Sequence, residues 1–239
     1  MSTVLVTGGS RGIGAATVRA LAGRYNVAFT YNAPESAALA LEQELAGKGG
    51  VKAFRCDVSD SASVKKAADE IRKRFGAVDM IVNSAGIAEK GLFQDITDEE
   101  WRKIFAVNVD GTFYVTREFL PDMISRQRGA IVNVSSVWGV VGASVETAYS
   151  ATKAAIIGLT KALSKEVAPS GITVNAVAPG AVDTDMLNCY SAEEKAEICR
   201  DIPLGRMATA DEIAKAIVFL LENGYVTGQV LTVDGGFAG

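Results

Sequence analysis

The sequence predicts one α/β domain, built on a doubly wound parallel sheet of about seven strands with helices on both faces, a Rossmann-like fold. Short apolar runs alternate with amphipathic helical stretches along the 239 residues. Most of these runs are continuously apolar and rich in β-branched residues, which is typical of strands buried on both faces. Charges are evenly spread and no linker or repeat interrupts the pattern, so one domain is expected over residues 1–239.

Seven short segments have the length and composition of buried strands. They are Thr3–Val6, Val27–Tyr31, Val51–Cys56, Met80–Val82, Ala130–Val134, Thr173–Val177 and Val230–Val233. Helical stretches separate them, and right-handed crossovers would make the strands parallel. In this architecture ligands bind beyond the carboxyl ends of the strands.

The helical stretches carry recognisable start and stop signals. Thr97 and Glu100 have capping-box spacing, so a long helix is expected to start there and run to Met123. Pro169 and Gly171 end the helix that precedes the sixth strand. The expected helices are Gly12–Arg24, Glu35–Ala46, Ser61–Phe75, Asp98–Met123, Thr147–Ala168 and Ala210–Leu221.

Composition excludes several kinds of chemistry. The chain has no histidine, which excludes a Ser-His-Asp triad, a Cys-His dyad and a His-ligated zinc, and no metal site is expected. The three cysteines, Cys56, Cys189 and Cys199, have no CxxC spacing, which favours a reducing compartment over a disulfide framework. A net charge of −4 gives no case for binding nucleic acid or an anionic membrane. With no signal peptide or membrane span recognisable, we expect a cytoplasmic protein.

A glycine-rich turn joins the first strand to the first helix. Glycines permit positive φ and close backbone approach, and a helix N-terminus attracts phosphate. The spacing Gly8-x3-Gly12-x-Gly14 differs from the usual dinucleotide fingerprint, so taken alone the turn could equally bind nothing. Its position favours a dinucleotide pyrophosphate. The residues concerned are Gly8, Ser10, Arg11, Gly12, Ile13 and Gly14.

The end of the second strand predicts which dinucleotide is bound. Enzymes selective for NAD usually carry an acidic residue there, which bonds the ribose 2′-hydroxyl. Tyr31 and Asn32 occupy this position, and the nearest acidic residue is Glu35, beyond Pro34. Arg11 could face a 2′-phosphate. We therefore predict NADP(H) as the cofactor, with Arg11 as its main cationic contact.

A tyrosine, a lysine and a serine could supply acid–base chemistry without histidine. Tyr149 and Lys153 are four residues apart on a predicted helix, so they share a face. A nearby ammonium lowers the pKa of a phenol, which makes a general acid or base. Ser136 follows the fifth strand, at the edge where ligands bind. The plainer alternatives are a surface pair for Tyr149 and Lys153, and a turn or cap for the serine.

Together these motifs make the chain resemble a short-chain dehydrogenase/reductase of the single-domain type. The matching positions are the Thr7–Gly14 turn, Asp57-Val58, Asn83-Ser84-Ala85-Gly86, Asn108, Ser136, Tyr149, Lys153, Pro179-Gly180 and Thr184. Ser84 departs from the usual second asparagine. The order and spacing of the motifs are specific, although each motif alone is weak.

The resemblance implies a role for each matching residue. Tyr149 is the general acid or base, Ser136 polarises the carbonyl, Lys153 bonds the nicotinamide ribose, and Asn108 assists a proton relay through water. Cofactor contacts are implied for Asp57 and Val58 at the adenine, for Asn83, Ala85 and Gly86 after the fourth strand, and for Pro179, Gly180, Val182 and Thr184 beside the nicotinamide.

Longer matches resemble the 3-oxoacyl-[acyl-carrier-protein] reductases. Members of that group dock an acidic carrier protein through arginines; here Arg126 and Arg128 remain, whereas Ser170 stands where an arginine is common. We expect NADPH-dependent reduction of a 3-oxoacyl thioester, with an acyl carrier protein as a candidate partner. The alternatives are an NADP(H) oxidoreductase for another ketone, such as a steroid, sugar acid or xenobiotic, and a non-catalytic dinucleotide-binding regulator.

Two further expectations concern the surroundings of the site and the assembly. The segment Leu187–Arg200 should cover the substrate, and Trp138 either lines an apolar wall or anchors a loop. In the family, the two long helices pair across a twofold axis, so the resemblance implies a homotetramer. The plainer alternative is that these helices only cover the sheet.

Overall fold

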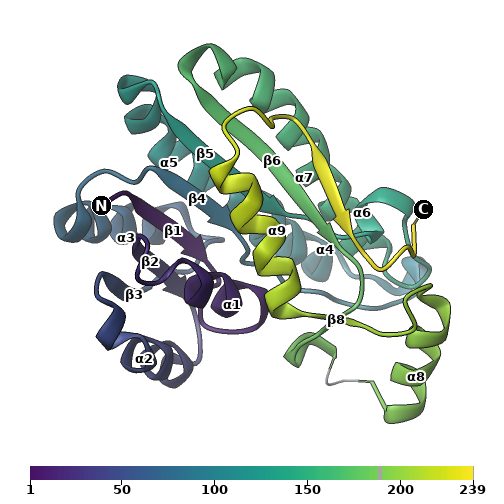
Figure 1. Cartoon of the computed structure of the whole chain (residues 1–239). Coiled ribbons are helices and arrows are strands. Elements are labelled where there is room, and N and C mark those ends of the chain that lie inside the picture. Colours follow the sequence, from purple (N-terminus) through teal and green to yellow (C-terminus); the bar gives the residue numbers. More distant parts are fainter. Residues whose placement is uncertain (188–189, 239) are drawn as a thin grey trace.

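The computed structural model describes residues 1–187 and 190–238, which form a three-layer α/β domain (Figure 1). Its main sheet has seven strands in the order β3-β2-β1-β4-β5-β6-β9, and every neighbouring pair is parallel. The predicted fold class is confirmed. The strands are β1 Thr3–Thr7, β2 Asn26–Tyr31, β3 Val51–Arg55, β4 Met80–Asn83, β5 Gly129–Val134, β6 Ile172–Pro179 and β9 Val230–Val233.

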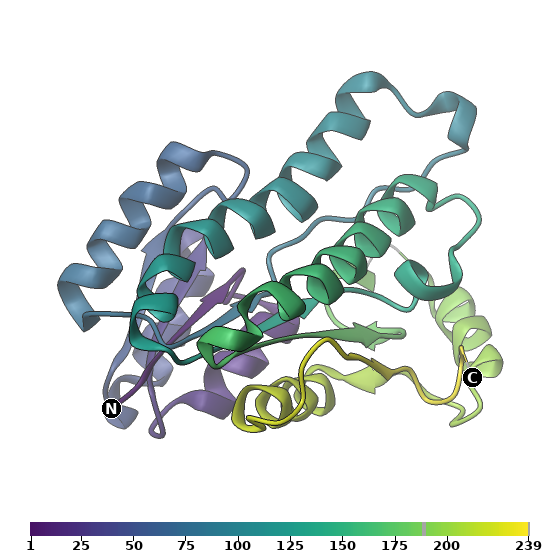
Figure 2. The ribbon, with the colours of Figure 1, turned by 90° about the horizontal axis from the view of Figure 1, so that it is seen from above.

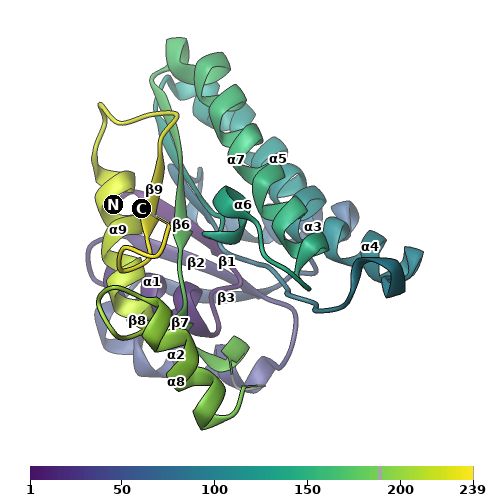
Figure 3. The same ribbon diagram turned by 90° about the vertical axis from the view of Figure 1, so that its right-hand side faces the viewer.

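The main helices cover the sheet on both faces (Figures 2 and 3). One face carries α1 (Gly12–Leu21), α2 (Glu35–Glu44) and α9 (Ala210–Glu222). The other carries α3 (Ser61–Phe75), α5 (Gly111–Arg126) and α7 (Thr147–Val167). Successive strand residues face opposite layers: Val4 and Val6 of β1 pack on the first group, whereas Leu5 packs on the second.

The predicted long helix from Asp98 is helical but not regular, which corrects the prediction of one continuous α-helix. It starts at the capping box of Thr97 and Glu100, as predicted, and forms α4 (Asp98–Phe105). A π-helical turn, Ala106–Asp110, follows, and α5 then continues to Arg126. Such turns insert an extra residue into a helix and often occur at functional sites.

Several short elements were not predicted from the sequence. They are α6 (Trp138–Val141), α8 (Ala192–Asp201) and a small parallel pair formed by β7 (Val182–Asp183) and β8 (Ala208–Thr209). α8 lies within the segment expected to cover the substrate, and Cys189 of that segment lies outside the described residues. None of the described helices is long and apolar enough to span a membrane.

Candidate active site

The glycine turn packs directly against the segment that follows β4. A Cβ on Gly8, which has φ +63°, would lie 2.8 Å from the Ala85 Cα atom. A Cβ on Gly14 would lie 2.2 Å from the Gly8 carbonyl oxygen, so neither position accepts a side chain without backbone movement. The Thr7 hydroxyl accepts hydrogen bonds from the Ser84 and Ala85 amides, at 3.0 and 3.1 Å. The turn is thus held close to the end of β4.

The start of α1 is suited to an anion. The first turn of the helix contains no acidic residue, so its free N–H groups and positive dipole end are not neutralised locally. The lining of a hollow of about 380 Å³ beside it includes Ser10, Arg11, Gly12, Arg19 and Thr184, and also the aspartates Asp183, Asp185 and Asp211. The residues present therefore fit a dinucleotide pyrophosphate, and Arg11 lies where a cation could meet a further phosphate.

The end of β2 differs from the sequence-based expectation. The Tyr31 hydroxyl donates a hydrogen bond of 2.8 Å to a Glu35 carboxylate oxygen. Burial and this bond raise the pKa of Tyr31. Glu35 follows Pro34 and was expected only as the nearest acidic residue, whereas its carboxylate contacts the side chain of Tyr31, the last residue of β2. Asn32, beside it, is exposed.

Asp57, Val58 and Asn83, which were predicted to contact the cofactor, also make contacts within the protein. The Asp57 carboxylate accepts hydrogen bonds from the Ser59 amide and hydroxyl, at 3.0 and 2.6 Å. Val58 is buried against Gly111, the first residue of α5. The Asn83 amide donates to Thr116 and Asn133, so its side chain ties β4 to α5 and β5.

Gly86 lies where two of the predicted catalytic residues, Asn108 and Lys153, approach the β4 end. A Cβ built on it would lie 3.2 Å from the Asn108 Oδ1 atom and 3.4 Å from the Lys153 Nζ atom. Asn108 is on the π turn between α4 and α5, and its side chain bonds both the amide and the carbonyl of Ile87, each at 2.9 Å. The irregular helix thus presents Asn108 to the strand edge.

Ser136 and Tyr149 lie together, and Lys153 extends past them to the sheet. The Ser136 hydroxyl is near enough to Tyr149 for hydrogen bonding between the two side chains to act on the Tyr149 pKa. The Lys153 ammonium is 5.5 Å from the centre of the Tyr149 ring and donates a 2.9 Å bond to the Val134 carbonyl oxygen. Ser135 bonds the Lys153 carbonyl, which fixes α7 to the end of β5. The structure therefore brings together the serine, tyrosine and lysine that the sequence suggested.

The protonation behaviour of this group corrects one expectation. Burial raises the pKa of Tyr149 to about 12; the bond with Ser136 opposes this shift, and the Glu146 carboxylate adds to it. Burial also lowers the pKa of Lys153 to about 8. The expected lowering of the Tyr149 pKa by Lys153 is not found: burial is the largest cause of the shift, and Lys153 is not among its causes. At neutral pH both groups hold their protons.

The last predicted cofactor segment, after β6, reaches the glycine turn at Gly12. Gly180, after β6, contacts Asp234 so closely that a Cβ there would lie 2.8 Å from the Asp234 Cβ atom. Val182 is buried in the β7–β8 pair, and Thr184 packs beside Gly12. Pro179 ends β6 and is paired with Val233 of β9. This segment and the β4 end therefore contact the turn at different residues, Gly12 and Gly8.

Two further residues lie around the site: Trp138, for which the sequence left an apolar wall or a loop anchor open, and Glu146, which the sequence did not single out. Trp138 is the first residue of α6 and meets Phe237 edge to face, with ring centres 5.3 Å apart, so it anchors α6 to the C-terminal segment. Glu146, at the N-cap of α7, lies 4.0 Å from the Lys90 ammonium and bonds Tyr190. These contacts join segments far apart in the chain, which no local pattern reveals.

The glycine turn, together with the hydroxyls of Ser136 and Tyr149 and the ammonium of Lys153, is typical of a dinucleotide-dependent oxidoreductase. Comparison with known proteins gives the family. A family model described as enoyl-(acyl carrier protein) reductase matches residues 8–238. The chain belongs to the short-chain dehydrogenase/reductase family, as its motifs suggested.

Individual relatives match over nearly their full length. The chain is 43% identical over 240 residues to the uncharacterized oxidoreductase YmfI of Bacillus subtilis, covering 98% of each chain. It is 40% identical over 234 residues to the 3-oxoacyl-[acyl-carrier-protein] reductase FabG of Escherichia coli, covering 97% of this chain and 95% of FabG. Among solved structures, ElxO with NADP bound matches with a TM-score of 0.91 and 33% identity, covering 99% of this chain and 98% of ElxO.

Proposed function

We propose that this oxidoreductase reduces a 3-oxoacyl thioester to the 3-hydroxyacyl thioester. The observation that carries the proposal is that Ser136 and Lys153 both lie near Tyr149, while the Lys153 ammonium also approaches Gly86, after β4. The cofactor is NADP(H), as in the ElxO structure, and when bound it supplies the hydride.

The residues of the site perform the proton chemistry. The Tyr149 hydroxyl, protonated at neutral pH because its pKa is about 12, donates a proton to the oxygen of the reduced carbonyl. The Ser136 hydroxyl bonds the same oxygen as negative charge develops on it. Lys153 remains an ammonium below its pKa of about 8 and holds positive charge beside the ring of Tyr149. Asn108, near Lys153, supports resupply of the proton.

The cofactor would be held by the residues that surround the glycine turn. Gly8, Ser10, Gly12, Ile13 and Gly14 present backbone groups to the pyrophosphate, and Arg11 faces the 2′-phosphate. The remaining contacts are assigned to the strand ends: Tyr31, Asn32, Asp57, Val58, Asn83, Ala85, Gly86, Pro179, Gly180, Val182 and Thr184.

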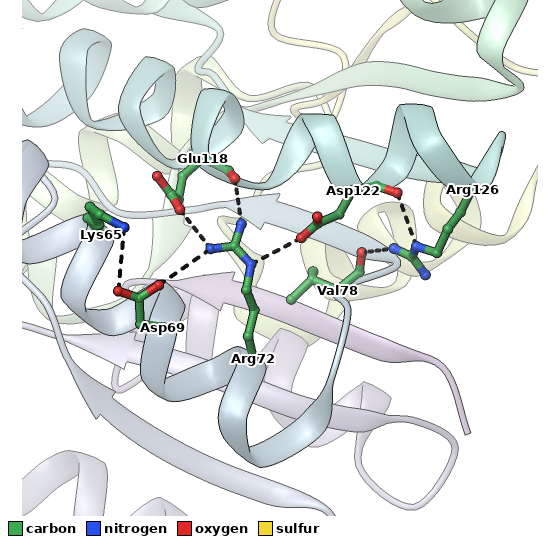
Figure 4. A network of polar contacts seen from close by, with 7 residues as sticks. All are labelled: Lys65, Asp69, Arg72, Val78, Glu118, Asp122 and Arg126. Atoms are coloured by element: carbon green, nitrogen blue, oxygen red, sulfur yellow. Dashed lines mark hydrogen bonds and ion pairs between the residues drawn. The ribbon is translucent and has the colours of Figure 1, made fainter.

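Two observations bear on whether the acyl group is carried by a protein or by coenzyme A: the names of the relatives and the basic turn before β5. Relatives named 3-oxoacyl-[acyl-carrier-protein] reductase support an acyl carrier protein as partner. Arg126, however, is bonded to the carbonyls of Val78 and Asp122 (Figure 4). It also pairs with the Asp79 carboxylate, and 25% of its side chain is exposed. Arg128 is 67% exposed but lies 3.2 Å from the same aspartate.

This neutralised turn favours a coenzyme A thioester, or another small ketone, over a docked carrier protein. A single exposed arginine that already faces a carboxylate offers little attraction to an acidic partner, because such exposed ion pairs are weak and screened by salt. The assembly we propose is a cytoplasmic homotetramer, paired through α4, α5 and α7. A purely regulatory dinucleotide sensor has no need of the serine–tyrosine–lysine group.

The test is a set of spectrophotometric assays with NADPH and NADH. Acetoacetyl-CoA, a carrier-linked 3-oxoacyl group, a steroid ketone and a sugar-acid ketone are supplied in parallel. We expect the highest kcat/KM with NADPH and a 3-oxoacyl thioester. A higher kcat/KM with an unrelated ketone would replace the substrate assignment, and no oxidation of NADPH with any carbonyl would reject the enzymatic role.

Substitution of the proposed acid tests the mechanism separately. Tyr149→Phe should lower kcat by at least ~10²-fold, because the proton donor is lost, and should leave NADPH affinity unchanged by calorimetry. Tyr225→Phe is the control, since Tyr225 is fully exposed at 100%. Turnover of Tyr149→Phe close to that of the unaltered protein would remove this residue from the mechanism.

A further inference from the structure

Thr152 lies inside α7 between the two catalytic residues and is completely buried, with 0% of its surface exposed. Its hydroxyl donates a hydrogen bond of 2.7 Å to the Tyr149 carbonyl oxygen. The Thr152 hydroxyl oxygen in turn accepts a bond of 3.0 Å from the Asn108 side-chain amide. Thr152 therefore connects the backbone of the proposed acid to the π turn.

The connection continues to the cofactor side of the site. Asn108 bonds the amide and the carbonyl of Ile87, which directly follows Gly86. A chain of hydrogen bonds thus runs from the backbone after β4, through Asn108 and Thr152, to Tyr149. It spans three segments that meet only in the folded protein.

The start of α7 is held by contacts with other segments, such as Glu146 with Lys90, and not by a cap of its own. Within the described chain, its N-cap residue Glu146 makes no side-chain capping bond. Val145, just before it, has φ +56°, in the left-handed region that disfavours a β-branched residue. The helix start that carries Tyr149 is therefore less firmly closed than that of α4, which has a complete capping box.

We propose that Thr152 is a positioning residue, which holds Tyr149 at the correct distance from the nicotinamide end of the site. This inference rests on the proposed function, since it gives Thr152 a role only through the proton donated by Tyr149. Displacement of a reacting group by about 1 Å can lower a rate by ~10²-fold, so a modest shift of the first turn would be visible in kcat.

The chain contains a matched control two turns further along the same helix. Thr160 is also 0% exposed. Its hydroxyl donates 2.8 Å to the Ile156 carbonyl and accepts 2.9 Å from the Asn133 side-chain amide. Thr152 and Thr160 thus make the same two bonds, to an asparagine amide and to a carbonyl one turn back. They differ in whether that carbonyl belongs to the proposed acid.

The experiment compares Thr152→Val, Thr152→Ser and Thr160→Val in the full-length protein. Valine keeps the shape and removes both bonds, whereas serine retains them. We expect Thr152→Val to lower kcat about tenfold, with KM and the NADPH Kd from calorimetry within about twofold of the unaltered protein, and Thr152→Ser to restore most of kcat. Both valine variants should lower Tm by a similar amount, about 2–4 °C.

A double-mutant cycle separates positioning from general loosening. In the Tyr149→Phe background, Thr152→Val should lower the residual rate by less than about twofold, because the group it positions is gone. Equal losses of kcat in Thr152→Val and Thr160→Val, or a full further loss in the double variant, would overturn the proposal. If Thr152→Val does not fold, Thr152→Ala is measured against Thr160→Ala with the same criteria.

Failure of the proposed function gives a different result. In that case the unaltered protein turns over no carbonyl substrate, so there are no kcat values to compare among the variants. The role assigned to Thr152 is then rejected together with that of Tyr149. Turnover by the unaltered protein that does not respond to Thr152→Val rejects the positioning role alone.

Discussion

At the scale of single residues, burial acts on Tyr149 and Lys153 in opposite directions. It favours the neutral form of each, so the phenol becomes a weaker acid and the ammonium a stronger one. The helical spacing of the pair is visible in the sequence, but the direction of the Lys153 side chain is not. The Lys153 side chain extends to the Val134 carbonyl. Because burial there lowers its pKa to about 8, Lys153 titrates within the pH range of ordinary experiments.

The lowered pKa of Lys153 predicts a dependence of stability on pH. The folded-state value is about 8 and the unfolded value 10.5, so between them the unfolded chain binds more protons. The free energy of unfolding should therefore rise with pH in this interval, by about 2 kcal/mol between about pH 8 and about pH 10. Lys153→Met should flatten this rise. Urea unfolding at both pH values measures it, and equal slopes in the two proteins would contradict the prediction.

A second prediction at this scale concerns how Arg11 and Glu35, which carry opposite charges, set the affinity for NADPH relative to NADH. Arg11→Gln should weaken NADPH binding at least about tenfold, because a hydrogen-bonded charge partner of the 2′-phosphate is lost, and leave NADH binding unchanged. Glu35→Gln should strengthen NADPH binding, since it removes a carboxylate from the end of β2. Calorimetric titration with both cofactors decides. Parallel losses for NADPH and NADH in Arg11→Gln would show that Arg11 contacts the common pyrophosphate instead.

At the scale of elements, the glycine turn is the most constrained segment of the site. Gly14→Ala would place a methyl group 2.2 Å from the Gly8 carbonyl, which is backbone and cannot move aside cheaply. We expect a loss of about 1–3 kcal/mol in the free energy of unfolding and weakened NADPH binding. Gly47→Ala is the control, because a Cβ there meets nothing within 4 Å. Unchanged NADPH affinity in Gly14→Ala would show that the turn can accept a side chain at this position and still bind the cofactor, which would contradict the prediction.

The helix from Asp98 to Arg126 shows where sequence patterns stop being informative. Its start was predictable, because the Thr97–Glu100 box is a local signal. The π turn was not, since one extra residue hardly changes the apolar pattern. The strands were predictable for the opposite reason: a strand buried on both faces shows its burial in every residue. The hydrogen bond from the Tyr31 hydroxyl to the Glu35 carboxylate, in contrast, could not be predicted from the sequence pattern.

At the scale of the whole molecule, the outer side of α4 and α5 leaves large apolar groups in solvent. Phe113 is 44% exposed and Trp101 36%, and both lie on the helices through which we propose that copies pair. Phe113→Lys should therefore give species smaller than a tetramer in sedimentation velocity, because a charge would enter the interface. Leu39→Lys, at a site 52% exposed on α2 across the sheet, should not. A monomer in the unaltered protein would reject the assembly.

The edge contact between Trp138 and Phe237 gives the crevice a natural optical reporter. The chain has two tryptophans, and Trp101 is stacked on Phe105 of α4. Trp101→Phe would leave Trp138, two residues after Ser136, as the sole indole emitter. Reduced nicotinamide absorbs where indole emits, so resonance energy transfer would follow docking of the coenzyme in real time, before any ketone has been found.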